Sequence, residues 1–183
     1  EIDQHAPSHA IIASNTSSIS ITALASATNR PEKVCGMHFF NPPQLMKLVE
    51  VVKGAKTSEE TINTVLDVSH RMGKETVLVK KDTPGFIVNR ILIPALNEAV
   101  ALHWEGIADR DDIDKAVKLG LNWPMGPLLL LDHIGVDTTL AIMEVLEKEL
   151  DPKFHPCPEL KEMVEAQLLG RKSGKGFYDW TQK

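Results

Sequence analysis

His38 and Glu50 are the residues whose types and spacing are best suited to proton transfer. His38 lies near the end of a short apolar run, and Glu50 interrupts a second run over residues 48–52. The period-2 geometry of a strand puts Glu50 on the same face as Leu48 and Val52, where a carboxylate is costly unless a donor or cation meets it. On neighbouring strands, Glu50 would fix the tautomer of the imidazole and stabilise its protonated form, which makes His38 a candidate base near neutral pH. The alternative is a histidine that only satisfies its own hydrogen bonds in the core.

Two further polar segments are candidates for ligand contact. Asn89 falls on a helical row with Phe86, Ile93, Leu96 and Val100, so its amide must find a partner, either in the linker before it or on a bound ligand. Residues 15–18, Asn-Thr-Ser-Ser, directly follow the first predicted strand, where loops of α/β proteins meet ligands. For this segment the alternative is a simple helix entry capped by a serine.

Neither a phosphate-binding glycine loop nor a metal site is expected in these 183 residues. The single G-x-G, Gly174-Lys175-Gly176, lacks the third glycine and follows no predicted strand, and residues 170–175 also miss the Walker spacing. His5 and His9 have the i,i+4 spacing of metal ligands, but Pro7 between them breaks the helix that would align them.

The elements that must position these residues change character near the middle of the chain. Short apolar runs predict strands over residues 9–14, 34–40, 48–52 and 76–79, with helices after Ser20 and after a capping box formed by Thr57 and Glu60. Strands that alternate with helices indicate an α/β layer, part of a doubly wound, Rossmann-like sheet.

After the turn signal at residues 82–85, the strand pattern stops and only helical patterns remain. Helices are predicted over residues 86–104, 107–120, 136–150 and 158–170, with a loop at 122–127. We therefore expect a partial doubly wound domain over residues 1–83, followed by an all-α helical domain over residues 84–183.

Composition excludes several classes of protein. With 20 basic and 25 acidic residues the net charge is −5, and no basic tract is present, so nucleic acid is not expected as a partner. The longest apolar block, residues 128–131, is too short to cross a membrane. Cys35 and Cys157 form neither a disulfide framework nor a zinc site, which favours a cytoplasmic location.

Several longer motifs resemble one enzyme family, the 3-hydroxyacyl-CoA dehydrogenases. They are Ser14-Asn15-Thr16-Ser17-Ser18, His38-Phe39-Phe40-Asn41-Pro42, Lys47 to Val52, Asp82 to Arg90, Pro124-Met125-Gly126-Pro127 and Gly174 to Tyr178, which occur in family order over nearly the whole chain.

The resemblance implies an oxidoreductase that transfers hydride between an acyl-CoA substrate and NAD. His38 would be the general base or acid, Glu50 would orient it, and Ser17 and Asn89 would hydrogen-bond the reacting acyl group. Asn41, Ser17 and Lys172 would contact the cofactor. The resemblance also implies a homodimer formed through the helical domain.

The chain departs from the family because the glycine loop and the acidic ribose-binding residue have no counterpart in it. It therefore corresponds to the C-terminal portion of these enzymes, and we expect these residues alone to bind NAD poorly and to turn over little. Two alternatives remain open at this point: a dehydrogenase of a hydroxy acid without CoA, and a non-catalytic structural or dimerisation fragment.

Overall fold

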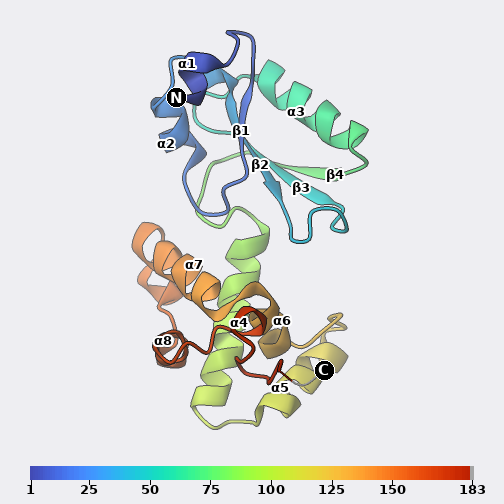
Figure 1. Cartoon of the computed structure of the whole chain (residues 1–183), viewed down its shortest axis with the longest axis vertical. Coiled ribbons are helices and arrows are strands. Elements are labelled where there is room, and N and C mark those ends of the chain that lie inside the picture. Colours follow the sequence, from blue (N-terminus) through green and yellow to red (C-terminus); the bar gives the residue numbers. More distant parts are fainter. Residues whose placement is uncertain (182–183) are drawn as a thin grey trace. The chain divides into compact units, whose positions relative to one another are not determined.

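The computed structural model describes residues 1–181, which form two compact units, Glu1–Asn89 and the part from Arg90 onward. Each unit has its own layers and its own core (Figure 1).

The first unit is built on a four-stranded mixed sheet in the order β1-β2-β3-β4. Its strands are β1 (Ile12–Ser14), β2 (Val34–Phe39), β3 (Leu48–Val52) and β4 (Glu75–Val79). The outer pairs are parallel, whereas β2 and β3 are antiparallel. Residues 40–47 that join β2 to β3 are too few for the crossover that a parallel pair needs. The predicted α/β class and its four strands are confirmed, and the antiparallel central pair is the feature that the sequence analysis did not include.

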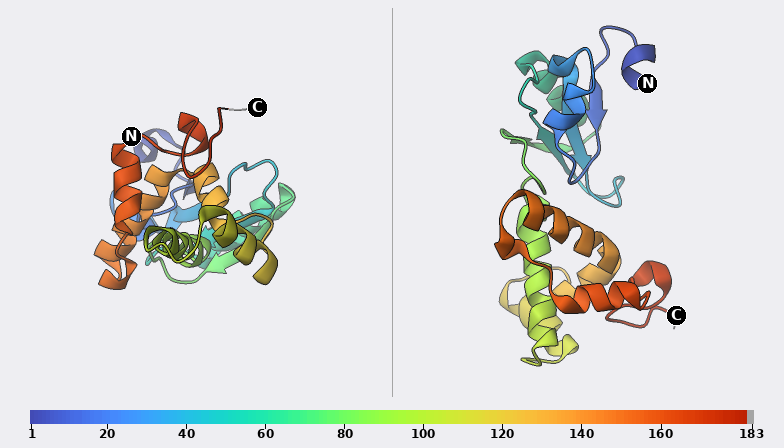
Figure 2. Two further views of the ribbon diagram at one scale, coloured as in Figure 1. Left: turned by 90° about the horizontal axis from the view of Figure 1, so that it is seen from below. Right: turned by 90° about the vertical axis from the view of Figure 1, so that its left-hand side faces the viewer.

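Helices cover both faces of this sheet. The helix α2 (Ile21–Ser26) packs on one face with Val34, Val52 and Val79, and α3 (Glu59–Arg71) packs on the other (Figures 1 and 2). Shorter turns are α1 (Ile2–His5) and η1 (Pro31–Lys33).

The predicted cap at Ser20 is confirmed, because its hydroxyl accepts from the backbone N–H of Ala23 at 3.1 Å. The predicted capping box at Thr57 is wrong. Ser58 caps α3 by accepting from the N–H of Thr61, whereas the Thr57 hydroxyl is buried and donates to the carbonyl of Val34 at 2.6 Å. Thr57 therefore ties the start of α3 to the sheet instead of capping the helix.

The second unit is helical, as predicted. Its helices are α4 (Val88–Trp104), α5 (Arg110–Gly120), α6 (Pro127–Ile134), α7 (Val136–Glu149) and α8 (Pro158–Glu165), with short turns η2 (Pro152–Phe154) and η3 (Arg171–Ser173). Leu96, Leu128, Leu131, Leu146 and Leu160 form the centre of its core and have no exposed surface.

Several helices differ from the prediction. Those predicted over residues 107–120 and 158–170 are shorter, Arg110–Gly120 and Pro158–Glu165. The helix predicted from residue 86 starts at Val88, because Phe86 has a φ of +48° and cannot be helical. The helix α6 was not predicted. It begins with Pro127 at its first position, where the missing N–H of proline costs no hydrogen bond.

Asp132 on α6 holds the C-terminal segment. Its buried carboxylate accepts from the backbone N–H groups of Phe177 and Tyr178 and from the indole N–H of Trp180, at 2.8–2.9 Å. Gly176 is required there, since a Cβ would lie 2.1 Å from Oδ1 of Asp132.

Within residues 1–181, no helix is long and apolar enough to cross a membrane. The same part of the chain holds no group of three or more His, Cys, Asp or Glu residues arranged to bind a metal ion.

Candidate active site

His38 and Glu50 are directly opposite each other on β2 and β3, and Nδ1 of His38 lies 2.7 Å from Oε2 of Glu50. His38 is 5% exposed and Glu50 is fully buried. The predicted pairing of these two side chains on neighbouring strands is therefore present in the structure.

The second carboxylate oxygen of Glu50 is also occupied. Oε1 accepts from the backbone N–H groups of Ile87 and Val88, each at 3.0 Å. Three hydrogen bonds to one buried carboxylate favour its ionised form. Because an ionised carboxylate only accepts, Nδ1 of His38 must carry a proton, and in the neutral imidazole Nε2 is then the nitrogen with the free lone pair.

Two aromatic rings flank the imidazole. The ring of Phe40 is 4.7 Å from it and tilted by 57°, and the ring of Phe86 is 5.4 Å away in an edge arrangement at 62°. The imidazole is thus held at one nitrogen by Glu50 and packed against two aromatic rings.

The loop after β1 is joined to the end of β2. Oδ1 of Asn15 accepts from the backbone N–H of Phe39 at 2.9 Å. The hydroxyl of Thr16 accepts from the N–H groups of Ser18 and Ile19, which folds the turn that contains Ser17. Ser17 is therefore held on an ordered turn at the carboxyl end of β1.

A hollow of about 430 Å³ opens beside these strand ends. Its lining residues are Asn15, Phe39, Phe40, Asn41 and Pro43. Two aromatic rings and two side-chain amides line it, and the ring of Phe40 is shared with the imidazole of His38. The hollow is therefore adjacent to the proposed base.

The remaining predicted site residues lie in different places. Asn89 is half-buried in the first turn of α4, directly after Val88, whose amide binds Glu50. Lys172 belongs to the helical unit, where its ammonium lies 2.6 Å from Oδ2 of Asp137. The first unit therefore contains His38, Glu50, Ser17, Asn41 and Asn89, and Lys172 lies in the other.

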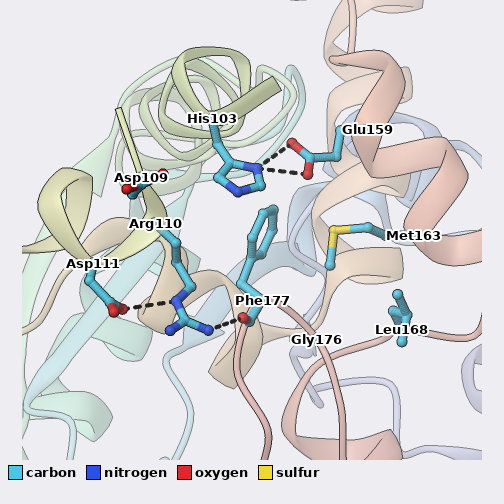
Figure 3. A pocket seen from close by; sticks show the side chains of 9 residues that line it. All are labelled: His103, Asp109, Arg110, Asp111, Glu159, Met163, Leu168, Gly176 and Phe177. Carbon is cyan, nitrogen blue, oxygen red and sulfur yellow. Dashed lines mark hydrogen bonds and ion pairs between the residues drawn. The ribbon is translucent and has the colours of Figure 1, made fainter. Parts of the chain in front are cut away.

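The helical unit has a larger hollow of about 490 Å³ (Figure 3). Four of its titratable side chains are paired: Nδ1 of His103 contacts both oxygens of Glu159 at 2.8 and 3.0 Å, and Arg110 binds Asp111 as well as the carbonyl of Phe177. None of the predicted site residues lines it. This hollow is larger than the one beside His38, but it lies in the other unit, away from the proposed base.

Sequence reasoning missed the supporting roles of Asn15 and Phe86. Asn15 was part of the segment singled out, but its bond to Phe39 depends on the parallel pairing of β1 with β2. Phe86 was assigned to a helix. The Pro84-Gly85 dipeptide before it was the available signal, because such a dipeptide marks a turn.

Comparisons with known proteins agree with this geometry. Residues 1–83 match the family model "3-hydroxyacyl-CoA dehydrogenase, NAD binding domain", and residues 85–180 match "3-hydroxyacyl-CoA dehydrogenase, C-terminal domain". A probable 3-hydroxybutyryl-CoA dehydrogenase of Bacillus subtilis is 54% identical over 183 residues, and a mitochondrial hydroxyacyl-coenzyme A dehydrogenase of Sus scrofa is 50% identical over 182 residues.

Among solved structures, an (S)-3-hydroxybutyryl-CoA dehydrogenase from Ralstonia eutropha superimposes with a TM-score of 0.95 at 50% identity. The match covers 99% of this chain and 64% of that one. The two curated relatives are covered over 63% and 57% of their length, and this chain is covered over 100% and 98%. The chain thus spans about three fifths of the proteins that it matches.

Proposed function

The chain belongs to the 3-hydroxyacyl-CoA dehydrogenase family, and from this premise we propose that it carries the proton-transfer site of an enzyme that interconverts 3-hydroxyacyl-CoA and 3-oxoacyl-CoA with NAD. The observation that carries the proposal is the buried His38–Glu50 pair, whose imidazole keeps Nε2 available as a base.

In the oxidation direction, Nε2 of His38 takes the proton of the substrate 3-hydroxyl while hydride leaves C3. Glu50 stabilises the imidazolium that forms, because its negative charge is held 2.7 Å from Nδ1 in a water-poor site. In the reverse direction the imidazolium returns this proton to the ketone oxygen.

Ser17 and Asn89 are proposed to hydrogen-bond the reacting acyl group. Their positions support this role, because Ser17 lies on the ordered turn after β1 and Asn89 follows the amides that bind Glu50. A hydroxyl and a side-chain amide can both donate to an acyl oxygen.

The residues beside His38 fit a nicotinamide. The 430 Å³ hollow has the size of a small-molecule site, and it combines the rings of Phe39 and Phe40 with the amides of Asn15 and Asn41. Such a lining can stack an aromatic ring and hydrogen-bond a carboxamide. NAD, when bound, supplies the hydride acceptor, and Asn41 and Ser17 are the contacts that we propose for it.

Lys172 is the third proposed cofactor contact. Its ion pair with Asp137 is partly exposed, with side chains 47% and 38% accessible, so exchanging this partner for a cofactor phosphate or hydroxyl costs little.

The helical unit supports a homodimer. Ile91, Ile107, Leu119 and Leu121 are each 65–72% exposed, and large exposed apolar side chains of this kind are typical of subunit interfaces. Light scattering coupled to size exclusion tests this proposal: a dimer mass supports it, and a monomer at micromolar concentration contradicts it.

A reducing, cytoplasmic location is the compartment that we propose. Both cysteines are buried and free, and burial raises the pKa of the Cys35 thiol to about 11, so it stays protonated and unreactive at neutral pH.

A substrate panel tests the proposed reaction and separates it from the alternatives. The protein, expressed from its complete native reading frame, is assayed for NADH loss with acetoacetyl-CoA, with free acetoacetate and with a sugar keto acid. Activity on the thioester alone supports the proposal. Activity on the free acids alone indicates a dehydrogenase that does not use CoA, and no activity on any of the three supports a structural role.

A further inference from the structure

Phe86 has a backbone conformation that an aromatic residue rarely adopts. Its φ is +48°, next to Gly85 at +73°, and the residue is only 3% exposed. Bulky side chains are strongly disfavoured in the left-handed region, so a conformation of this kind persists only where the surroundings impose it. Such outliers concentrate at functional sites.

The consequence of this conformation is visible at Glu50. The N–H of Phe86 donates to the carbonyl of Thr83 and closes a tight turn. The chain then leaves the turn with the next two N–H groups, those of Ile87 and Val88, both directed at Oε1 of Glu50. If Phe86 were helical, α4 would begin earlier in the chain. The N–H groups of Ile87 and Val88 would then point along the helix axis.

The side chain of Phe86 contacts His38, the partner of Glu50. The centroid of its ring lies 5.4 Å from the centroid of the His38 imidazole in an edge arrangement, and Phe86 belongs to the core cluster that contains Ile21, Val52 and Val79. One residue therefore contacts His38 through its side chain and directs two donors to Glu50 through its backbone.

We propose that Phe86 is a positioning residue for proton transfer, which fixes the imidazole plane and holds Glu50 as the ionised acceptor of Nδ1. The expected effect of Phe86 on turnover rests on the proposed function. Its effect on the His38 ring can be measured without any substrate.

The test compares Phe86→Leu with Phe154→Leu in the full-length protein. Phe154 is similarly buried, at 9% exposed, but it lies in the core of the helical unit. Both changes replace a buried phenyl group by a smaller apolar one, so both lower the melting temperature. Only Phe86→Leu is expected to lower kcat, by about tenfold, with little change in KM.

The ring nitrogens of His38 supply the second readout, by nitrogen NMR of the substrate-free protein. In the wild type, measured where the imidazole is neutral, they should show a proton at Nδ1 and none at Nε2, and Phe86→Leu should shift both signals while Phe154→Leu leaves them unchanged. If Phe86→Leu fails to fold, Phe86→Asn replaces it, because asparagine tolerates the left-handed turn while lacking the ring.

Unchanged His38 signals and unchanged kcat in the Phe86 variants would overturn the inference. Shifted His38 signals in a protein without dehydrogenase activity would support the positioning role and refute the proposed function instead.

Discussion

Glu50 binds His38 through one carboxylate oxygen and the start of α4 through the other, at 2.7 Å from Nδ1 and at 3.0 Å from the N–H of Val88. The Glu50 carboxylate therefore accepts on both sides, from the imidazole on one and from backbone amides on the other. This acceptor role decides which nitrogen of the imidazole carries the proton, and hence which nitrogen of His38 can act as a base.

Glu50→Gln is predicted to invert the tautomer of His38. Two backbone N–H groups fix the side-chain oxygen of the introduced amide, so its NH₂ group faces Nδ1, which must then accept. The proton moves to Nε2, and kcat for 3-hydroxyacyl-CoA oxidation should fall by about 10²- to 10⁴-fold.

Glu60→Gln is the matched control, since Glu60 is an exposed carboxylate on α3. It should leave kcat unchanged. If both variants lost activity, or if neither did, the predicted tautomer change of His38 would not be the cause.

Asn15→Ala is predicted to loosen the loop that contains Ser17. The change removes the acceptor of the Phe39 N–H at the edge of the hollow, which should cost on the order of 1 kcal/mol of unfolding free energy. The KM for NADH should rise several-fold in steady-state assays. Asn15→Asp keeps an acceptor at the same place and should preserve the unfolding free energy, so an equal loss in both variants would refute this role.

Asp132→Asn is predicted to destabilise the C-terminal segment. Three N–H donors converge on the two carboxylate oxygens of Asp132. The amide of asparagine would offer only one oxygen, and its NH₂ group would face at least one of these N–H donors. The unfolding free energy in urea should fall by about 3 kcal/mol. Asp112→Asn, an exposed change in the first turn of α5, should cost less than about 0.5 kcal/mol, and a comparable effect of both would contradict the prediction.

Tyr178 is predicted to make stability depend on alkaline pH. Burial and its hydrogen bond to Asp114 raise its pKa well above the ordinary value of 10.0. The folded protein holds the phenol proton more tightly than the unfolded chain, so this stabilisation is complete below about pH 10 and is lost as pH rises towards the folded pKa.

Tyr178→Phe should therefore lower the unfolding free energy at neutral pH and flatten its decline above about pH 10. The sequence contains one tyrosine, so the difference in tyrosinate absorbance between the two proteins reports on this residue. Ionisation of Tyr178 at its ordinary pKa would refute the prediction.

Local patterns indicated the two residues at the centre of the candidate site. The polar residue inside the apolar run at 48–52 indicated a buried carboxylate, and His38 was its predicted partner on condition that the two strands were neighbours. The antiparallel pairing of β2 and β3 meets that condition but was not itself predicted. The buried position of Glu50 follows from strand periodicity, a property of residues close in sequence.

Features that depend on distant pairing could not be predicted in the same way. The contacts of Asp132 with residues 177–180 join segments 45–48 positions apart, and the left-handed turn at Phe86 is stabilised by the sheet core beneath it. Local propensity favours a helix at residue 86, and tertiary packing overrides it.

The central claim is that His38 exchanges the proton in a 3-hydroxyacyl-CoA dehydrogenase. The most direct test measures acetoacetyl-CoA-dependent NADH loss for the full-length wild type, for His38→Gln and for the exposed control His9→Gln. We predict an active wild type, an unaffected His9 variant, and a kcat about 10²- to 10⁴-fold lower for His38→Gln with KM nearly unchanged. An inactive wild type, or a His38 variant as active as the wild type, would contradict the account.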